Sequence, residues 1–324
     1  MKFTRLIFIG LLIYAPLSAV ASPLQWALEF PKTKFNQSTA PLSEIQFVGL
    51  HRDQIPAIFK PKFKSANSIS DLGLLEPVLR LEVKGEVRGY SLRMLVWHEL
   101  INDTIKGVPV LISYSPLCSS GVVFDRRLDN QVLSFANTGL LRHYDTIMYD
   151  TATESWFQQY TGGAIVGRLS GKRLKPIASR IQSFEQFKAE LPKAKIMIPS
   201  DPKSHDYGKT PYVRMDSRID TAAQFTYSIP DGVGPFDRVV VMGNEVWPLK
   251  HVRKFGRIET PNLVISWSAG MNSIHDTRWI PFGRDIGNVR VQSNSPEGWS
   301  EAVHDTPFAF AFAAFHPNGV WHVE

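Results

Sequence analysis

Residues 112–121 read Ile112-Ser113-Tyr114-Ser115-Pro116-Leu117-Cys118-Ser119-Ser120-Gly121 and include the only cysteine of the 324-residue chain. An apolar run over residues 108–114 precedes the Ser115-Pro116 pair, and the apolar residues 122–124 follow the glycine. A serine-proline pair between two apolar runs is typical of a tight turn. The stretch therefore predicts two adjacent strands whose connecting turn carries Cys118.

Similar strand patterns recur along the rest of the chain. Alternation over residues 80–90 predicts a hairpin with Gly85 in its turn. The apolar run over residues 308–315 also alternates, which predicts a strand that ends at His316. With 44% hydrophobic residues, the chain has enough apolar side chains to fill a core.

Two segments predict helices. Residues 92–102 are apolar on nearly every side, so we expect a largely buried helix there. Residues 183–191 predict a second helix, in which Ser183 and Gln186 have the spacing of a capping box. The fold class is therefore predicted to be α+β and β-rich, with a few short helices.

Several segments of the first half recur in the second half in the same order. The pairs are residues 81–85 with 239–243, 90–95 with 247–252, and 112–121 with 265–273. We predict an internal duplication of two related β-rich halves, about 51–198 and 212–324, packed as one unit. The alternative is that strand-rich chains reuse the same hairpin chemistry.

The two predicted halves differ in length where the first contains His98. The chain runs 21 residues from Leu92 to Ser113 but only 17 from Leu249 to Ser266, which is a difference of about one helical turn. We therefore expect the helix of residues 92–102 to be full length only in the first half. Features that one half has and the other lacks are the first candidates for function.

The N-terminus has the features of an export signal. Lys2 and Arg5 precede the apolar residues 6–17, which are too few to span a membrane, and Ala19-Val20-Ala21 forms a small-residue cleavage site. We predict a signal peptide at residues 1–21 and an N-terminal arm at residues 22–50. The mature protein is then periplasmic or secreted with no membrane span, and the alternative is an uncleaved anchor.

The net charge and the cysteine count exclude some classes of function and of stabilisation. Loss of Lys2 and Arg5 lowers the formal net charge from +6 to +4, which does not indicate a nucleic-acid partner. A single cysteine cannot form an intrachain disulfide, so stability must come from the core. No complete phosphate-binding loop, hydrolase nucleophile elbow or dinucleotide fingerprint occurs in the sequence.

Cys118 is the first candidate for chemistry. Its small neighbours, Ser119, Ser120 and Gly121, leave room for a ligand and supply backbone N–H groups that can lower the pKa of the thiol. These features suit a metal-binding or redox thiolate. The alternative is a buried small hydrophobic residue, as unpaired cysteines often are.

His98 and His316 are candidate metal ligands together with Cys118. The His98-Glu99 pair resembles the start of a zinc-protease helix, but Asn102 stands where the second histidine should be. A cysteine and an imidazole together would suit copper or zinc. The alternative for both histidines is a structural role.

His143 and Asp145 follow a predicted glycine turn. His143 is both a candidate metal ligand and a candidate general base for a Cys118 nucleophile, and Asp145 is a candidate for positioning or ionising a histidine. The alternative is that Asp145 closes a turn through side-chain to backbone hydrogen bonds.

The sequence resembles domain of unknown function family 3179 (DUF3179) from about residue 50 to the C-terminus. The motifs that carry the resemblance are Asp53-x-Ile55-Pro56-Ala57-Ile58, Arg88-Gly89-Tyr90-Ser91-Leu92, Trp97-His98-Glu99-x-x-Asn102-Asp103, Pro109-Val110, Tyr114-Ser115-Pro116-Leu117-Cys118, Asp145-x-x-Met148-Tyr149-Asp150, Glu154-Ser155-Trp156 and Gly167-x-x-x-Gly171. The resemblance implies no mechanism. Members of this family typically carry Cys-Pro-Leu-Cys, whereas this chain has Ser115 at the first position, which excludes a dithiol shuttle in this turn.

Two hypotheses follow from these residues. The first is an exported protein that binds a transition metal through one thiolate or acts through a thiol. The second is a module that binds a small ligand or a protein, with Cys118 as a structural residue and no catalysis. Whether the protein is an enzyme stays open at this point.

Overall fold

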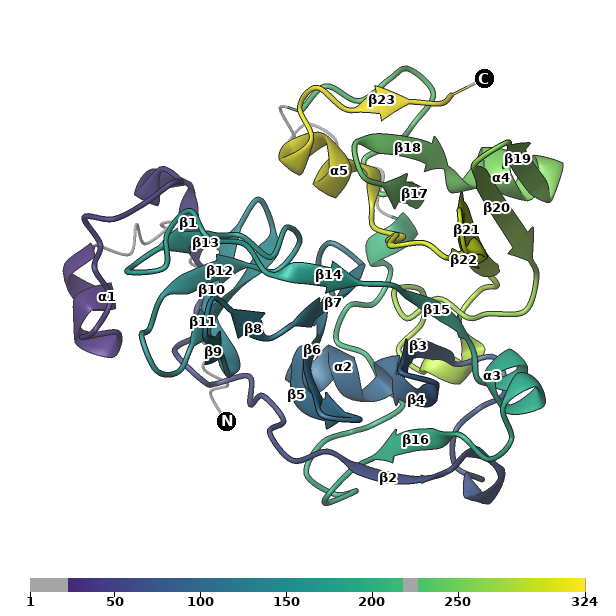
Figure 1. The fold of residues 1–324 in the computed structure, drawn as a ribbon, viewed down its shortest axis with the longest axis horizontal. Helices are drawn as coiled ribbons and strands as arrows, with labels where there is room; N and C mark the ends of the chain where they lie inside the picture. The colour runs from purple at the N-terminus through teal and green to yellow at the C-terminus, as the bar shows by residue number, and fades with distance from the viewer. Residues whose placement is uncertain (1–22, 218–226, 324) are drawn as a thin grey trace, which may run out of the picture.

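The computed structural model describes residues 23–217 and 227–323, and short antiparallel strands dominate it (Figure 1). The predicted signal peptide lies outside the described residues. Among the described strands, only the pairs β4–β16 and β18–β23 are parallel. No described helix is long and apolar enough to cross a membrane.

Three sheets and a small hairpin contain the strands of the first half. The first sheet has the order β1 (Ile45–Phe47), β10 (Phe135–Arg142), β11 (Asp145–Asp150), β12 (Trp156–Gln158), β13 (Ala164–Val166). The second has the order β14 (Lys175–Ile177), β7 (Ser120–Asp125), β6 (Val108–Ser115), β5 (Leu100–Ile105). The third has the order β15 (Ser179–Ser183), β3 (Pro77–Val83), β4 (Glu86–Ser91), β16 (Lys195–Ile198), β2 (Lys62–Ser65). The hairpin pairs β8 (Arg127–Leu128) with β9 (Gln131–Val132).

The second half contributes two further sheets. One has the order β17 (Val239–Met242), β18 (Glu245–Pro248), β23 (Val320–Trp321). The other has the order β19 (Arg257–Thr260), β20 (Leu263–Ser268), β21 (Asn288–Ser295), β22 (Gly298–Glu301). The α-helices of the described residues are α1 (Pro23–Glu29), α2 (Leu92–His98), α3 (Phe184–Glu190), α4 (Leu249–Phe255) and α5 (Ala309–Phe315).

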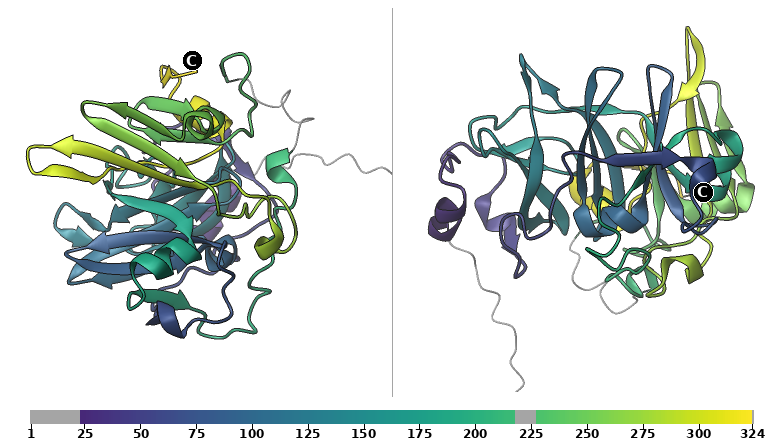
Figure 2. Two further views of the ribbon diagram at one scale, coloured as in Figure 1. Left: turned by 90° about the vertical axis from the view of Figure 1, so that its right-hand side faces the viewer. Right: turned by 90° about the horizontal axis from the view of Figure 1, so that it is seen from below.

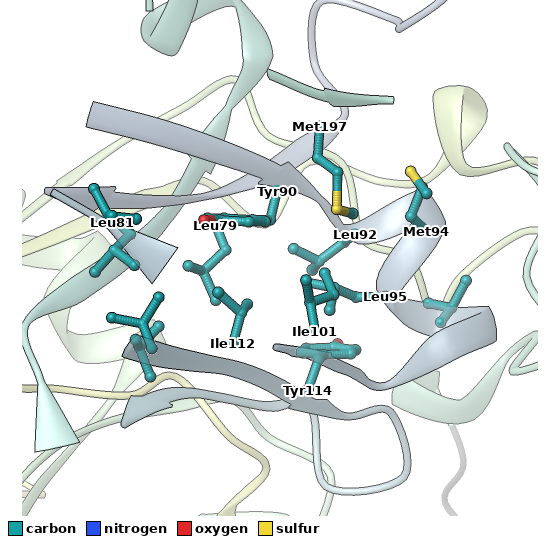
Figure 3. Close-up of a cluster of buried hydrophobic side chains, with 14 of the residues drawn as sticks. Leu79, Leu81, Tyr90, Leu92, Met94, Leu95, Ile101, Ile112, Tyr114 and Met197 are labelled. Carbon is teal, nitrogen blue, oxygen red and sulfur yellow. The ribbon is translucent and has the colours of Figure 1, made fainter. Parts of the chain in front are cut away.

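The small sheets are arranged side by side in a propeller-like manner (Figures 1 and 2). One buried cluster fills the space between the sheets around α2, and it includes Leu79, Leu95, Ile112 and Tyr114 (Figure 3). Ile274 and Ile280 of the second half belong to the same cluster. Residues 51–198 and 212–324 therefore contribute to one core. The prediction of a β-rich fold with a few short helices is confirmed.

The strand pair around the cysteine turn forms as predicted. β6 and β7 pair through Ser115 and Ser120, and residues 116–119 connect them. The hairpin of β3 and β4 is also present, with Lys84 and Gly85 at positive φ in its turn. The Ser183 side-chain hydroxyl accepts a hydrogen bond from the backbone N–H of Gln186 at the start of α3, as the spacing of the two residues predicts.

Two predicted elements were wrong. The helix expected over residues 92–102 ends at His98, and residues 100–105 form strand β5. The run over residues 308–315, expected as a strand, is helix α5. Both segments are buried on nearly all sides, so an apolar run does not distinguish helix from strand there. The alternating alanines of α5 also favour a helix.

The order of hairpin, helix and hairpin occurs in both halves, as β3–β4–α2–β5–β6 and as β17–β18–α4–β19–β20. Helices α2 and α4 each contain seven residues, so the expectation of a longer helix in the first half was wrong. The extra residues lie in the strands, since β5 and β6 have six and eight residues and β19 and β20 have four and six. A duplication of whole halves stays a prediction.

Candidate functional site

A small pocket lies against the cysteine turn, and we call it the Glu99 pocket. Aliphatic side chains form its walls, among them Leu50, Ile55, Leu117, Leu140 and Leu141. Its polar lining residues are Glu99, Asn137, Thr146 and Tyr212. The cavity volume is about 50 Å³, several times the minimum that holds one water molecule.

Glu99 is the one acidic residue that lines this pocket. Only 5% of the residue is exposed, and Thr146 Oγ1 donates a hydrogen bond of 3.0 Å to its Oε2. No donor of the described residues reaches the second oxygen, Oε1. Burial raises the pKa of Glu99 to about 8, and the nearby Asp145 carboxyl adds to this effect, whereas the Thr146 hydrogen bond opposes it.

The backbone places Glu99 at the end of α2 in a conformation that glycine normally adopts. Its φ is +58°, its N–H donates to the Leu95 carbonyl at 2.8 Å, and its carbonyl accepts from Tyr114 N–H at 2.8 Å. A residue with a Cβ in the left-handed region carries strain of roughly 1 kcal/mol. Such strain often marks a functional position.

Gly256 occupies the corresponding place at the end of α4. Its φ is +70°, its N–H donates to the Val252 carbonyl at 2.8 Å, and its carbonyl accepts from Trp267 N–H at 2.9 Å. The same hydrogen-bonded corner therefore occurs twice, with glycine in one case and glutamate in the other. The glutamate is not needed to make the corner.

A β-bulge in β10 brings Asn137 into the pocket. The pairing with β11 shifts between Asn137 and Leu140, and Gly139 within the bulge has a φ of +77°. A Cβ at Gly139 would lie 2.6 Å from the Leu50 carbonyl oxygen, so the bulge can pack there only with glycine. The Asn137 amide group donates to the carbonyls of Ile55 at 3.0 Å and His98 at 3.1 Å, and its buried oxygen has no partner.

Buried hydrogen bonds connect Glu99 to the cysteine turn. The hydroxyl oxygens of Thr146 and Ser115 are 3.3 Å apart, and Thr146 N–H donates to Ser115 Oγ at 3.2 Å. Ser115 also lies close enough to Asp145 and Cys118 to lower the pKa of both side chains. The turn therefore belongs to the same polar cluster as the pocket carboxyl.

Asp145 is fully buried within this cluster. It accepts hydrogen bonds from Gln158 Nε2 at 2.6 Å and from Tyr160 N–H at 2.9 Å. Burial raises the pKa of Asp145 to about 7, although these hydrogen bonds oppose the shift. The structure shows Asp145 beside the cysteine turn, and its proposed catalytic role stays a prediction.

Cys118 is fully buried among aromatic and aliphatic side chains that include Tyr160, Phe308 and Phe310. Its thiol faces the backbone carbonyl of His143 at 3.8 Å. Burial, together with the Asp145 charge, raises the pKa of Cys118 well above its usual value. A neutral, inaccessible thiol is the state of a structural cysteine.

The three candidate histidines have separate hydrogen-bond partners. His98 contacts the Pro56 carbonyl and the Tyr207 hydroxyl, each at 2.7 Å. His143 contacts the Tyr227 hydroxyl at 2.7 Å and Glu44 at 3.3 Å, and His316 contacts Asn244 at 3.2 Å. Burial lowers the pKa of all three, so each imidazole favours its neutral form.

Among the described residues, no three His, Cys, Asp or Glu side chains are grouped so that they could hold a metal ion. The contact between Cys118 and His143 runs through a backbone carbonyl and not through the imidazole. Copper or zinc binding by Cys118, His98, His143 and His316 therefore stays a prediction without a coordination geometry.

Residues 52–319 match the family described as "Protein of unknown function (DUF3179)". The chain belongs to this family. The DUF3179 match includes the cysteine turn and the polar residues of the Glu99 pocket. No curated protein and no solved structure matches the chain.

Sequence reasoning overlooked most of this DUF3179 pocket. Glu99 entered as part of an incomplete zinc-protease motif and of one motif of the family resemblance, but not as a site residue, and neither Asn137, Thr146 nor Tyr212 was identified as one. The available signal was a single acidic residue, Glu99, between a run of apolar residues and the apolar Leu100-Ile101 pair. An acidic residue within a buried segment indicates a function or a buried partner.

Proposed function

We propose that this DUF3179 protein binds a small organic ligand in the Glu99 pocket, and that Cys118 is a structural residue of the adjacent core. The observation that carries the proposal is Glu99 Oε1, a carboxyl oxygen that lines an apolar pocket and has no protein partner among the described residues. Burying a carboxyl without full hydrogen bonding is unfavourable, which a ligand can offset.

The shape of the site supports binding of a small molecule. Aliphatic walls with a few polar groups at one place are typical of ligand pockets. The walls come from segments far apart in the chain, among them Ile55, Leu117 and Leu140. Glu99, Asn137 and Thr146 are each at least 95% buried, so the polar groups are fixed before a ligand arrives.

Binding of four-carbon probe compounds tests this proposal. Ligand-observed NMR would compare the binding of n-butylammonium, n-butanol, butyramide and n-butyrate to the mature protein and to the variant Leu50→Trp. Leu50 is a half-buried residue of the pocket wall, and the larger tryptophan ring should occupy the pocket. We expect at least one probe to bind the mature protein and to lose binding in Leu50→Trp. The matched control is Leu28→Trp on α1, where Leu28 is 81% exposed. Absence of binding by every probe, or equal binding to Leu50→Trp, would contradict the proposal.

We also infer that the chain is exported. The basic residues Lys2 and Arg5, the apolar residues 6–17 and the Ala19-Val20-Ala21 site support this inference. Mass spectrometry of protein from the periplasm or culture medium should show a mature N-terminus at Ser22. Intact protein beginning at Met1 in the cytoplasm would contradict export.

A further inference from the structure

Two oxygen acceptors in the Glu99 pocket have no hydrogen-bond donor among the described residues. One is the amide oxygen of Asn137, which is buried without a partner. The other is Oε1 of Glu99, since the hydrogen bond that this carboxyl accepts from Thr146 goes to Oε2. The Asn137 amide group already donates to two backbone carbonyls, so this side chain can only accept a further hydrogen bond. Thr146 directs its hydroxyl hydrogen to Glu99 and likewise has only acceptor capacity left. A ligand that donates hydrogen bonds would complement these groups.

The pocket also contains no cation from the described residues. No described Lys, Arg or His side chain lines the pocket or forms an ion pair with Glu99. Most other buried acids are paired with cations, as Glu76 is with Arg93 and Asp103 is with Arg88. A positively charged ligand would therefore supply what this carboxyl lacks.

An aromatic residue completes the polar end of the pocket. Tyr212 lines the pocket. Burial raises the pKa of its hydroxyl, and the nearby Glu99 carboxyl adds to this effect. A carboxylate together with an aromatic ring is a combination that binds organic ammonium groups. The aliphatic walls, by contrast, match a hydrocarbon chain, and a cavity of about 50 Å³ limits that chain to a few carbon atoms.

We propose that the Glu99 pocket selects a small primary ammonium ion with a short apolar chain, through an ion pair between the ligand nitrogen and Glu99 Oε1. This inference rests on the proposed function, because it names the ligand class of the same pocket. The hydrocarbon chain contacts Leu117 and Leu140, and the ammonium group donates to Glu99 and Asn137.

The test compares ligands of nearly equal size and different charge. Titration calorimetry of the mature protein at pH 9, above the pKa of about 8 of Glu99 and therefore with its carboxyl ionised, would measure Kd for n-butylammonium, n-butanol and n-butyrate. We expect n-butylammonium to bind about tenfold or more tightly than n-butanol, since a hydrogen bond between two charged groups is stronger than one from a neutral hydroxyl. We expect no measurable binding of n-butyrate, because two negative charges would meet in a buried site.

The Glu99→Gln variant tests the role of the carboxyl while preserving its shape. The preference for n-butylammonium over n-butanol should disappear in Glu99→Gln. It should persist in Glu259→Gln, which removes an exposed carboxyl on β19. Circular dichroism would verify that each variant is folded. Glu99→Gly, which removes the carboxyl at a φ of +58° that suits glycine, should also lose the preference and gives a second reading if Glu99→Gln is not folded.

The outcomes separate this inference from the proposed function. Equal or tighter binding of n-butanol or n-butyrate, or a preference unchanged in Glu99→Gln, would overturn the ammonium assignment and leave a ligand pocket. Absence of binding by every compound to the mature protein would overturn both.

Discussion

Glu99 and Gly256 occupy the same hydrogen-bonded corner after a seven-residue helix, at φ values of +58° and +70°. In each case the N–H closes the helix and the carbonyl receives a hydrogen bond from the aromatic residue of the following hairpin, Tyr114 or Trp267. Glycine is the favoured residue for such a position. Gly256 shows that glycine is sufficient to form this corner. The first half nevertheless has a buried glutamate there, in a strained backbone conformation.

Substitution Glu99→Gly should stabilise the protein. It removes left-handed strain of roughly 1 kcal/mol and a buried carboxyl that is only partly hydrogen-bonded. We expect the free energy of unfolding in urea to rise by about 1 kcal/mol at pH 8, while binding to the pocket is lost. Gly256→Ala is the matched control, because a Cβ there meets no atom within 4 Å and only the φ strain is added. A less stable Glu99→Gly protein would contradict the account.

Stability should depend on pH through Glu99. Its pKa in the folded protein is about 8 and lies above the value of 4.5 of a solvated carboxyl, so the folded state binds the proton more tightly. This contribution to stability is fully present below about pH 4.5 and is lost as the pH rises through about 8. Relative to Glu99→Gln, the unmodified protein should lose about 2–4 kcal/mol between pH 5 and pH 9.

Urea unfolding at several pH values would measure that difference. Asp145, whose pKa of about 7 is raised in the same direction, titrates in both proteins, so its direct contribution cancels in the comparison. The exposed-site variant Glu259→Gln should follow the pH profile of the unmodified protein. A constant difference between Glu99→Gln and the unmodified protein from pH 5 to pH 9 would show that Glu99 has an ordinary pKa.

Cys118 should resist chemical modification in the folded protein. The thiol is fully buried and its pKa is raised, so iodoacetamide at pH 8 should react with it only after urea is added. Cys118→Ala should reduce the free energy of unfolding by about 1–2 kcal/mol, and leave probe binding to the pocket unchanged. Rapid alkylation without urea, or zinc or copper that is lost in Cys118→Ser, would favour the thiolate hypothesis instead.

Asp305 should be a main connection between the two halves. Its carboxyl accepts hydrogen bonds from Ser120 Oγ at 2.6 Å and from Gly121 N–H at 3.0 Å, directly after the cysteine turn. In Asp305→Ala the buried Ser120 hydroxyl and Gly121 N–H lose their acceptor. We expect the free energy of unfolding to fall by about 2–4 kcal/mol. Thermal unfolding would detect the loss. Asp129→Ala, at a residue with an exposed side chain, is the control, and an equally small effect of both substitutions would refute the role of Asp305.

The strands were the part of the fold that local pattern could predict. The β3–β4 hairpin and the β6–β7 pair join through turns that the sequence indicates, at Lys84-Gly85 and at Pro116, so their residues carry the signal themselves. The boundary between α2 and β5 carried no such signal. Residues on both sides are apolar, and the helix ends where Glu99 adopts a conformation that only its tertiary surroundings impose.

The Glu99 pocket could not be predicted from local sequence because its residues are scattered from Val48 to Tyr212. The bulge at Gly139 turns Asn137 inward, and neither residue has a neighbour in sequence that indicates a site. The reactive residue types in the sequence pointed instead to Cys118 and to three histidines. In the structure Cys118 lies in a buried core, and each histidine has other hydrogen-bond partners. The cysteine turn was a useful marker, since Pro116 and Leu117 line the pocket beside it.

The most direct test of the central claim is a crystal structure of the mature protein soaked with n-butylammonium. We expect ligand density in the Glu99 pocket, with the nitrogen about 3 Å from Glu99 Oε1 and the hydrocarbon chain against Leu117 and Leu140. An empty Glu99 pocket at a ligand concentration that saturates binding in solution, or a ligand bound elsewhere on the molecule, would contradict it.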